Sequence, residues 1–227
     1  MTARLLALCL FCLPSVAQGQ APPDPVALAQ GAKEATGRAA FVAFVEGTAT
    51  PQERSKAIRA LPRAKDQALV EKLKAWTANA SVFVQVEATI KLYQWGDSAF
   101  AYPLLVALRN QGVALRRAFQ LNQEGEPPKL DAAAERFFRE GLASSSAYVR
   151  VDSAVGLIHV GKPAGALDVI KDVLLNDPKY TTRLAAVNYL TPIKTSKGVR
   201  ELLKLAAKDI DEHVSARAKA VLATLED

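Results

Sequence analysis

Apolar residues recur every three to four positions along most of the chain, which is the spacing of one face of an α-helix. Three clear stripes are Leu69, Leu73 and Trp76; Ala166, Ile170, Val173 and Leu174; and Val199, Leu202, Leu203, Ala206 and Ile210. No stretch shows the alternating β-branched pattern of a strand. The pattern therefore predicts an all-α protein.

A second set of helices carries an internal repeat. The segment that begins at Tyr148 returns near Thr181 and His213, with earlier copies around Phe83 and Glu53 and a degenerate one near Arg117. The third residue of the motif marks successive copies at Arg54, Gln85, Arg117, Arg150, Arg183 and Ser215. Such a period of just over 30 residues is typical of α-solenoids.

Two further positions of the motif keep their character. A small residue stands three positions after the marker, at Ala57, Ala88, Ser153, Ala186 and Ala218. A leucine stands seven positions after it, at Leu61, Leu92, Leu157, Leu190 and Leu222. Small residues allow two helices to approach closely, and the leucine fills the space one turn further along. Only the third copy, with Gln120 and Glu124, lacks both.

Residues typical of helix starts and helix ends set the predicted boundaries of the repeats. Thr50-Pro51-Gln52-Glu53 has the form of a capping box, Asp177-Pro178 suggests a second cap, and Gly96 and Gly161 stand where helices should stop. We expect one domain, 20–227, with capping helices in 24–48. Its repeats are predicted at about 50–80, 81–111, 112–145, 146–178 and 179–210, with a half-repeat at 211–227. Phe41, Val42, Phe44 and Val45 are available to cover the first repeat.

These motifs resemble the HEAT-like repeat of the phycobilisome-lyase type over about residues 50–225. The best matches are Val149-Arg150, Gly161-Lys162-Pro163 and Asn176-Asp177-Pro178. The resemblance implies an α-solenoid, a right-handed superhelix of HEAT-like helix pairs. It implies little about function, because repeat folds serve many functions.

Residues 1–19 have the features of a cleaved signal peptide. Arg4 precedes an apolar stretch from Leu5 to Val16, and Ala17 and Gly19 suit a cleavage site. The stretch is shorter than the roughly 20 residues of a membrane span, and neither cysteine, Cys9 or Cys12, lies in a lipobox. We therefore expect a periplasmic or secreted protein. After cleavage it has no cysteine, so a packed core must stabilise it.

Charge is modest and uneven. The whole chain carries +6 at pH 7, with Lys and Arg concentrated between residues 53 and 74 and a nearly balanced C-terminal half. Nucleic-acid-binding proteins usually show a sustained basic face. The distribution therefore argues against a nucleic-acid partner.

The second helix of each pair is expected to line the concave face. The predicted partner-binding set combines residues expected to be exposed on these helices with aromatic residues of one turn: Lys72, Trp95, Tyr102, Arg109, Arg136, Arg139, Lys171, Lys204 and Lys208. Acidic residues are interleaved with them, so a solvated mixed-charge face explains the pattern equally. The aromatic turn, Tyr93 to Tyr102, could anchor a peptide or a sugar, or only pack the turn.

The marker arginines Arg54, Arg117, Arg150 and Arg183 could form a ladder that binds an anion. The family resemblance instead implies a structural ladder in which each arginine bonds a neighbouring turn.

Catalytic motifs are absent from the sequence. His159 and His213 are single and far apart, and neither a P-loop nor a G-x-S-x-G motif occurs. We therefore expect no cofactor, and a non-catalytic scaffold in the bacterial envelope, monomeric alone, that binds an extended protein or peptide on its concave face. The alternative is a bilin-lyase-like or other enzyme built on HEAT-like repeats.

Overall fold

The computed structural model describes residues 23–119, 132–159 and 161–225, without the side chain of Arg117. This part of the chain is all-helical and contains no strand, as predicted. Its N-terminal half comprises α1 (Pro25–Gly31), α2 (Ala35–Glu46), α3 (Pro51–Ala60), α4 (Gln67–Trp76), α5 (Val82–Gln94), α6 (Ser98–Asn110) and the 3₁₀-helix η1 (Arg116–Phe119). Its C-terminal half comprises α7 (Ala132–Gly141), α8 (Ala147–His159), α9 (Ala166–Asn176), α10 (Tyr180–Leu190), η2 (Thr191–Ile193), α11 (Val199–Ala206) and α12 (Glu212–Ala223).

Three predictions concern parts of the chain outside this description. The proposed signal peptide, residues 1–19, lies there, as does the long insertion 122–130 with Glu124. The side chain of Arg117 is likewise not described.

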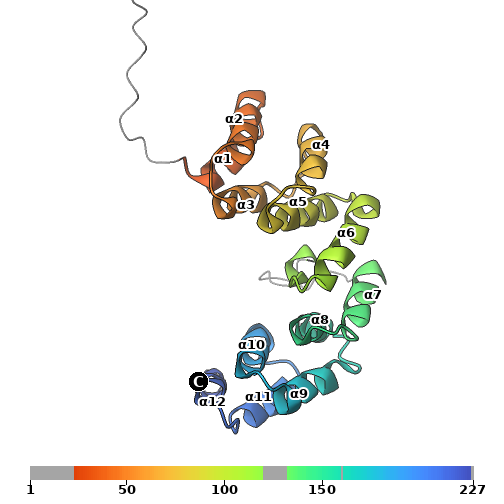
Figure 1. Cartoon of the computed structure of the whole chain (residues 1–227), viewed down its shortest axis with the longest axis vertical. Coiled ribbons are helices and arrows are strands. Elements are labelled where there is room, and N and C mark those ends of the chain that lie inside the picture. The colour runs from red at the N-terminus through yellow and green to blue at the C-terminus, as the bar shows by residue number, and fades with distance from the viewer. Residues whose placement is uncertain (1–22, 120–131, 160, 226–227) are drawn as a thin grey trace, which may run out of the picture.

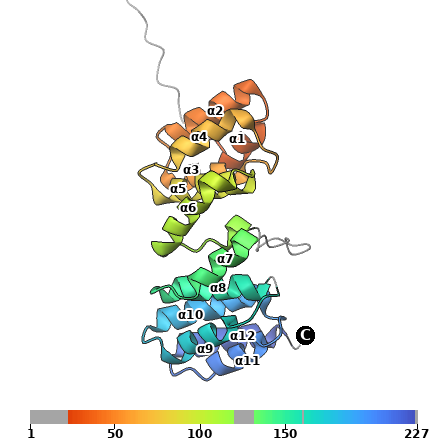
Figure 2. The ribbon, with the colours of Figure 1, turned by 90° about the vertical axis from the view of Figure 1, so that its right-hand side faces the viewer.

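The helices follow one another along an arc and form two rows (Figure 1). The inner row, on the side towards which the arc curves, contains α3, α5, η1, α8, α10 and α12. The outer row contains α4, α6, α7, α9 and α11, and α1 and α2 cover the N-terminal end. Seen from the outer side, the elements stack from α2 at one end to α11 and α12 at the other (Figure 2).

This arrangement corrects one expectation. The second helices were expected on the concave face, but the structure places them in the outer row and the repeat-bearing first helices in the inner row (Figure 1). The small residues of the repeat explain the difference. Ala57, Ala88, Ser153, Ala186 and Ala218 are all buried, and helices that carry small residues can approach more closely. Inner-row helices accordingly pack directly on one another, α3 on α5, α8 on α10 and α10 on α12.

The third repeat is described only in part. At the position of its first helix the described residues form η1, which packs between α5 and α8. Leu115, Ala118 and Phe119 are buried there, so this short element still continues the core. Both motif positions at which this copy departs from the repeat, Gln120 and Glu124, lie outside the described residues.

Helix ends follow the predicted signals with one exception. The capping box at the start of α3 is present, since Thr50 accepts from Glu53 N and the Glu53 carboxylate accepts from Thr50 N at 2.8 Å. Gly96 and Gly161 both have positive φ, at 85° and 73°. Asp177, however, does not cap α10. Lys179 holds that position, and the Asp177 carboxylate instead accepts from Lys179 N at 2.9 Å within the turn.

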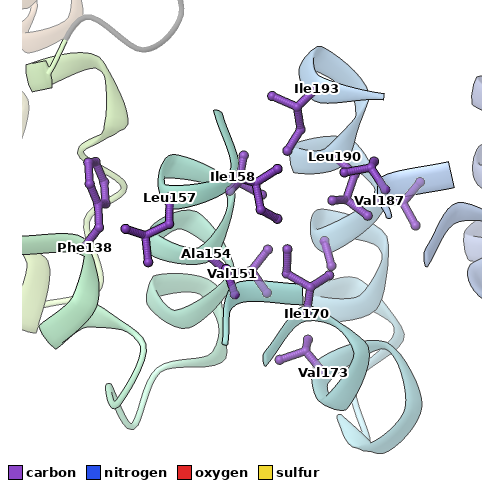
Figure 3. Packing of buried hydrophobic residues seen from close by; sticks show 14 of the residues in the cluster. Phe138, Val151, Ala154, Leu157, Ile158, Ile170, Val173, Val187, Leu190 and Ile193 are labelled. Atoms are coloured by element: carbon purple, nitrogen blue, oxygen red, sulfur yellow. The ribbon is translucent and has the colours of Figure 1, made fainter. Parts of the chain in front are cut away.

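The buried apolar residues form two clusters that meet at α5. Val84, Ala88 and Leu92 of α5 belong to the N-terminal cluster, whereas Val86 and Ile90 belong to the C-terminal one. In the C-terminal cluster, side chains of α7, α8, α9 and α10 pack together (Figure 3). The same helix therefore takes part in both cores.

The ends of the array differ. Phe41 and Val45 of α2 are buried in the N-terminal cluster, and Val42 and Phe44 pack against it, as expected for a cap. Ile210, expected in the apolar stripe of α11, is instead fully exposed. The reason is that α11 ends at Ala206, so Ile210 lies in the following turn and not on the helix face.

The close contact between α7 and α8 can be tested at Gly156. A methyl group at this mid-helix position would lie 2.7 Å from Cε1 of Phe138. We expect Gly156→Ala to lower the free energy of unfolding by about 1–2 kcal/mol through overpacking, although alanine favours helix by ~1 kcal/mol. Urea unfolding followed by circular dichroism measures the change.

Gly31→Ala is the matched control, because a methyl group at this end of α1 meets nothing within 4 Å. It should leave stability unchanged or raise it. Equal effects of the two substitutions would contradict tight packing at Gly156.

Candidate interaction surface

The predicted partner-binding cations lie on the outer row, and several are engaged in ion pairs on it. Lys72 contacts Glu46 at 2.8 Å, Arg136 contacts Glu140 at 2.7 Å, and Lys204 contacts Glu201 at 2.9 Å. Arg139 pairs with Glu135 in the same way. Solvent-exposed pairs of this kind add little stability, and here they neutralise the cations expected to attract a partner.

Three residues of that set are not exposed. Trp95 is 6% exposed, and its indole Nε1 donates to the carbonyl of Pro62 at 3.0 Å. Arg109 is 7% exposed, donates to the carbonyl of Phe137, and has its guanidinium carbon 4.7 Å from the centre of the Phe137 ring. Tyr102 is half-buried, with its ring edge towards Phe137. The aromatic turn therefore packs the interior, except for Phe100, which is 40% exposed.

Lys171 and Lys208 remain exposed as expected. Neither side chain forms an ion pair or hydrogen bond with another described residue. Lys171 lies on α9, whereas Lys208 lies in the turn after α11. The structure therefore does not bring the predicted set together as one surface.

Two of the marker arginines, Arg150 and Arg183, bond turns. Nη1 of Arg150 donates to the carbonyl of Ser144 at 3.0 Å, and Nη1 of Arg183 donates to that of Asp177 at 2.8 Å. Arg183 also makes two hydrogen bonds to Asp209, at 2.8 and 2.9 Å, which joins α10 to the turn after α11. This pairing lowers the pKa of Asp209. Arg54 differs, because its Nε is buried without a partner among the described residues.

The first two repeats are joined by polar contacts between α3 and α5. Nζ of Lys91 donates to the carbonyls of Leu61, at 2.8 Å, and Arg59, at 3.3 Å. Arg59 in turn makes two hydrogen bonds to Glu87, which is buried. Burial lowers the pKa of Lys91 to about 8, an effect that Glu87 opposes and Arg63 reinforces.

A buried carboxylate joins the third repeat to the fourth. Asp152 of α8 accepts from Leu115 N at 3.0 Å and from Nε of Arg116 on η1. The guanidinium of Arg116 also lies over the ring of Tyr189 on α10, 4.6 Å from its centre. Burial raises the pKa of Asp152, and the Arg116 charge counteracts this. These bonds join η1 and the residue before it to α8.

A different set of cations is exposed on the inner row. Gln52, Lys56 and Arg59 recur at the spacing of one face of α3, and Arg63 follows in the turn beyond the end of this helix. The other sides of α3 pack against α1, α2 and α5, so this stripe faces the inner side of the arc. We call Lys56, Arg59 and Arg63 the α3 basic surface.

Most of the positive charge on the α3 basic surface is not paired with a described carboxylate. Arg59 pairs with Glu87 but keeps 58% of its side chain exposed. The side chains of Lys56 and Arg63 are exposed and form no ion pair or hydrogen bond with a described residue. The predicted set omitted all three residues, although the concentration of Lys and Arg between residues 53 and 74 was the signal that pointed to them.

Neither histidine contributes to a cluster of ligands. His213 is exposed and lies beside the Tyr180 ring, and the pKa of His159 is lowered by burial and by Arg116. Within the described ranges, no three His, Cys, Asp or Glu side chains gather as metal ligands would. None of the helices described is long and apolar enough to cross a membrane.

No protein-family model fits the sequence, and no curated protein matches it.

The shifted pKa of Lys91 predicts a pH dependence of stability. Lys91 ordinarily titrates at 10.5 and in the folded protein at about 8. Between these values the unfolded chain binds more protons, so the folded state gains stability as pH rises. We expect the difference in free energy of unfolding between the wild type and Lys91→Met to shift by roughly 2 kcal/mol in favour of the wild type from pH 7 to 10.

Urea unfolding at several pH values measures this difference. Lys56→Met, at an exposed lysine, is the control and should follow the wild-type pH curve. Parallel curves for the wild type and Lys91→Met would contradict the assignment.

Proposed function

We propose that the protein is an exported, non-catalytic scaffold of the bacterial envelope that binds an extended acidic protein segment on its inner side. Its helix pairs are proposed to be HEAT-like repeats wound into a right-handed superhelix, and residues 1–19 to be its signal peptide. The mature protein would then act in the periplasm or outside the cell. The two-row arc and the periodic motif support the repeat assignment.

The α3 basic surface is the observation that carries the proposal. It combines two cations whose side chains have no described partner, Lys56 on α3 and Arg63 in the turn after α3, with the exposed Arg59. Charges of one sign on a recessed side of a protein attract and orient an oppositely charged partner. The partner segment is therefore expected to be acidic.

Rigidity of the inner row supports the same conclusion. Arg59–Glu87, Arg116–Asp152 and Arg217–Asn188 each join neighbouring elements of this row. Residues of α5 contribute to both apolar clusters. A surface that is already ordered loses little conformational entropy on binding, so it suits a long partner that must itself become ordered.

Affinity capture tests the proposal. The mature protein, residues 20–227, is immobilised and exposed to the envelope fraction, and captured proteins are identified by mass spectrometry. We expect a reproducible acidic partner that is lost with Lys56→Glu/Arg63→Glu and whose retention falls as salt rises from 50 to 500 mM, because screening weakens exposed charge pairs.

Lys171→Glu/Lys208→Glu is the matched control, since it reverses two exposed lysines without partners on the outer row. This variant should retain the partner. Capture that is equal for both variants and insensitive to salt would exclude the α3 basic surface. Reproducible failure to capture any protein, together with measured turnover of a small substrate, would overturn the scaffold function itself.

A further inference from the structure

A cavity of about 360 Å³ lies at the N-terminal end of the array, beside the α3 basic surface but distinct from it. Its walls come from the α1–α2 junction, the segment between α3 and α4, the start of α4 and the end of α5. Ligand pockets generally occupy ~300–1,000 Å³. This cavity is at the lower end of that range, so it has room for one aromatic or large aliphatic group with a small polar attachment.

The interior of the cavity is mostly apolar. The apolar lining residues come from four separate segments: Ala32, Leu61, Pro62, Ala64, Leu69 and Trp95. Trp95 is held in place by its hydrogen bond to the carbonyl of Pro62. A rigid apolar wall that contains an indole ring favours an apolar or aromatic group.

The mouth of the cavity is cationic. Lys33, Arg38 and Lys65 line it, and Asp66 is the only carboxylate among the lining residues. Arg38 is 3.3 Å from that carboxylate and donates to the carbonyl of Lys33 at 2.9 Å, so it neutralises Asp66 and ties the two walls together. The side chains of Lys33 and Lys65 are exposed, and neither ammonium group forms an ion pair or hydrogen bond with a described residue.

A further cation, Lys91, lies behind the cavity wall at Leu61. Nζ of Lys91 donates to the carbonyl of Leu61, one of the lining residues, at 2.8 Å. Its charge is buried, so it is screened less by water than a surface charge. Together these groups make the potential at the mouth positive, while the interior excludes polar groups that cannot find a hydrogen-bond partner.

We propose that this cavity is a binding site for an apolar carboxylate: an aromatic or large aliphatic group enters the cavity and its carboxylate lies between Lys33 and Lys65. Two sources have this chemistry, a small free acid and an acidic peptide with an apolar side chain. The site is independent of the α3 basic surface, because its lining includes neither Lys56 nor Arg59.

Nuclear magnetic resonance titration of the mature protein tests the site. The indole N–H signal of Trp95 reports on the cavity wall, and that of Trp76, which does not line the cavity, is the internal reference. We expect N-acetyl-phenylalanine to shift the Trp95 signal saturably, and N-acetyl-phenylalanine amide, which lacks the carboxylate, to bind several-fold more weakly. N-acetyl-aspartate, which lacks the apolar group, should not saturate the shift.

Two variants locate the ligand. Lys33→Glu/Lys65→Glu should weaken N-acetyl-phenylalanine binding by about tenfold, because two attractions become repulsions. Lys171→Glu/Lys208→Glu is the matched control and should bind as the wild type does. Ala64→Trp should abolish binding by filling the cavity, whereas Ala64→Ser keeps it open. Ala64 is exposed, so both changes at this position are compatible with folding.

A fourth probe, a capped acidic peptide with one internal phenylalanine, distinguishes the two sources of the ligand. Binding at least tenfold tighter than that of N-acetyl-phenylalanine identifies a partner segment, and equal or weaker binding identifies a free acid. The proposal is overturned if the amide binds as tightly as the acid, if the Trp95 signal does not move, or if Ala64→Trp binds unchanged.

Discussion

No helix pair in this protein can bury its own apolar surface, and the rest of the structure depends on that constraint. α5 shows it most clearly, because one set of its side chains packs into the N-terminal cluster and another into the C-terminal cluster. Small residues such as Ala57, Ala88 and Ala218 allow inner-row helices to pack on one another. The repeat-bearing helices therefore lie on the inner side of the arc, and the charged residues of the α3 basic surface lie there with them.

Polar groups within this framework serve mainly to join elements. Arg150 and Arg183 satisfy carbonyls in turns, Lys91 satisfies carbonyls at the end of α3, and Asp152 holds η1 and Leu115 against α8. Buried carbonyls without a partner are costly, so these bonds allow the turns to be buried. Four exposed cations in the N-terminal part have no described side-chain partner: Lys33, Lys56, Arg63 and Lys65. They carry the proposed binding functions.

Sequence periodicity predicted much of the secondary structure but little of the site. The 3.6-residue stripes and the capping box at Thr50 correspond to helices and caps in the structure. Periodicity shows which residues share a face, yet it does not show which neighbour covers that face. Arg109 was therefore expected to be exposed but is buried against Phe137, and the second helices were assigned to the wrong side of the arc. Ile210 was misplaced because α11 ends earlier than its stripe suggested.

Peptide-resolved hydrogen exchange tests most directly whether stability passes from neighbour to neighbour along the array. Leu92→Ala removes a fully buried side chain of the N-terminal cluster, and Leu203→Ala does the same in the C-terminal cluster. Each change should cost about 2–5 kcal/mol locally. The account predicts faster exchange in α1–α5 for Leu92→Ala and in α9–α12 for Leu203→Ala, with the opposite end unchanged in each case. Equal acceleration in every helix for either variant would contradict it and indicate a single cooperative core.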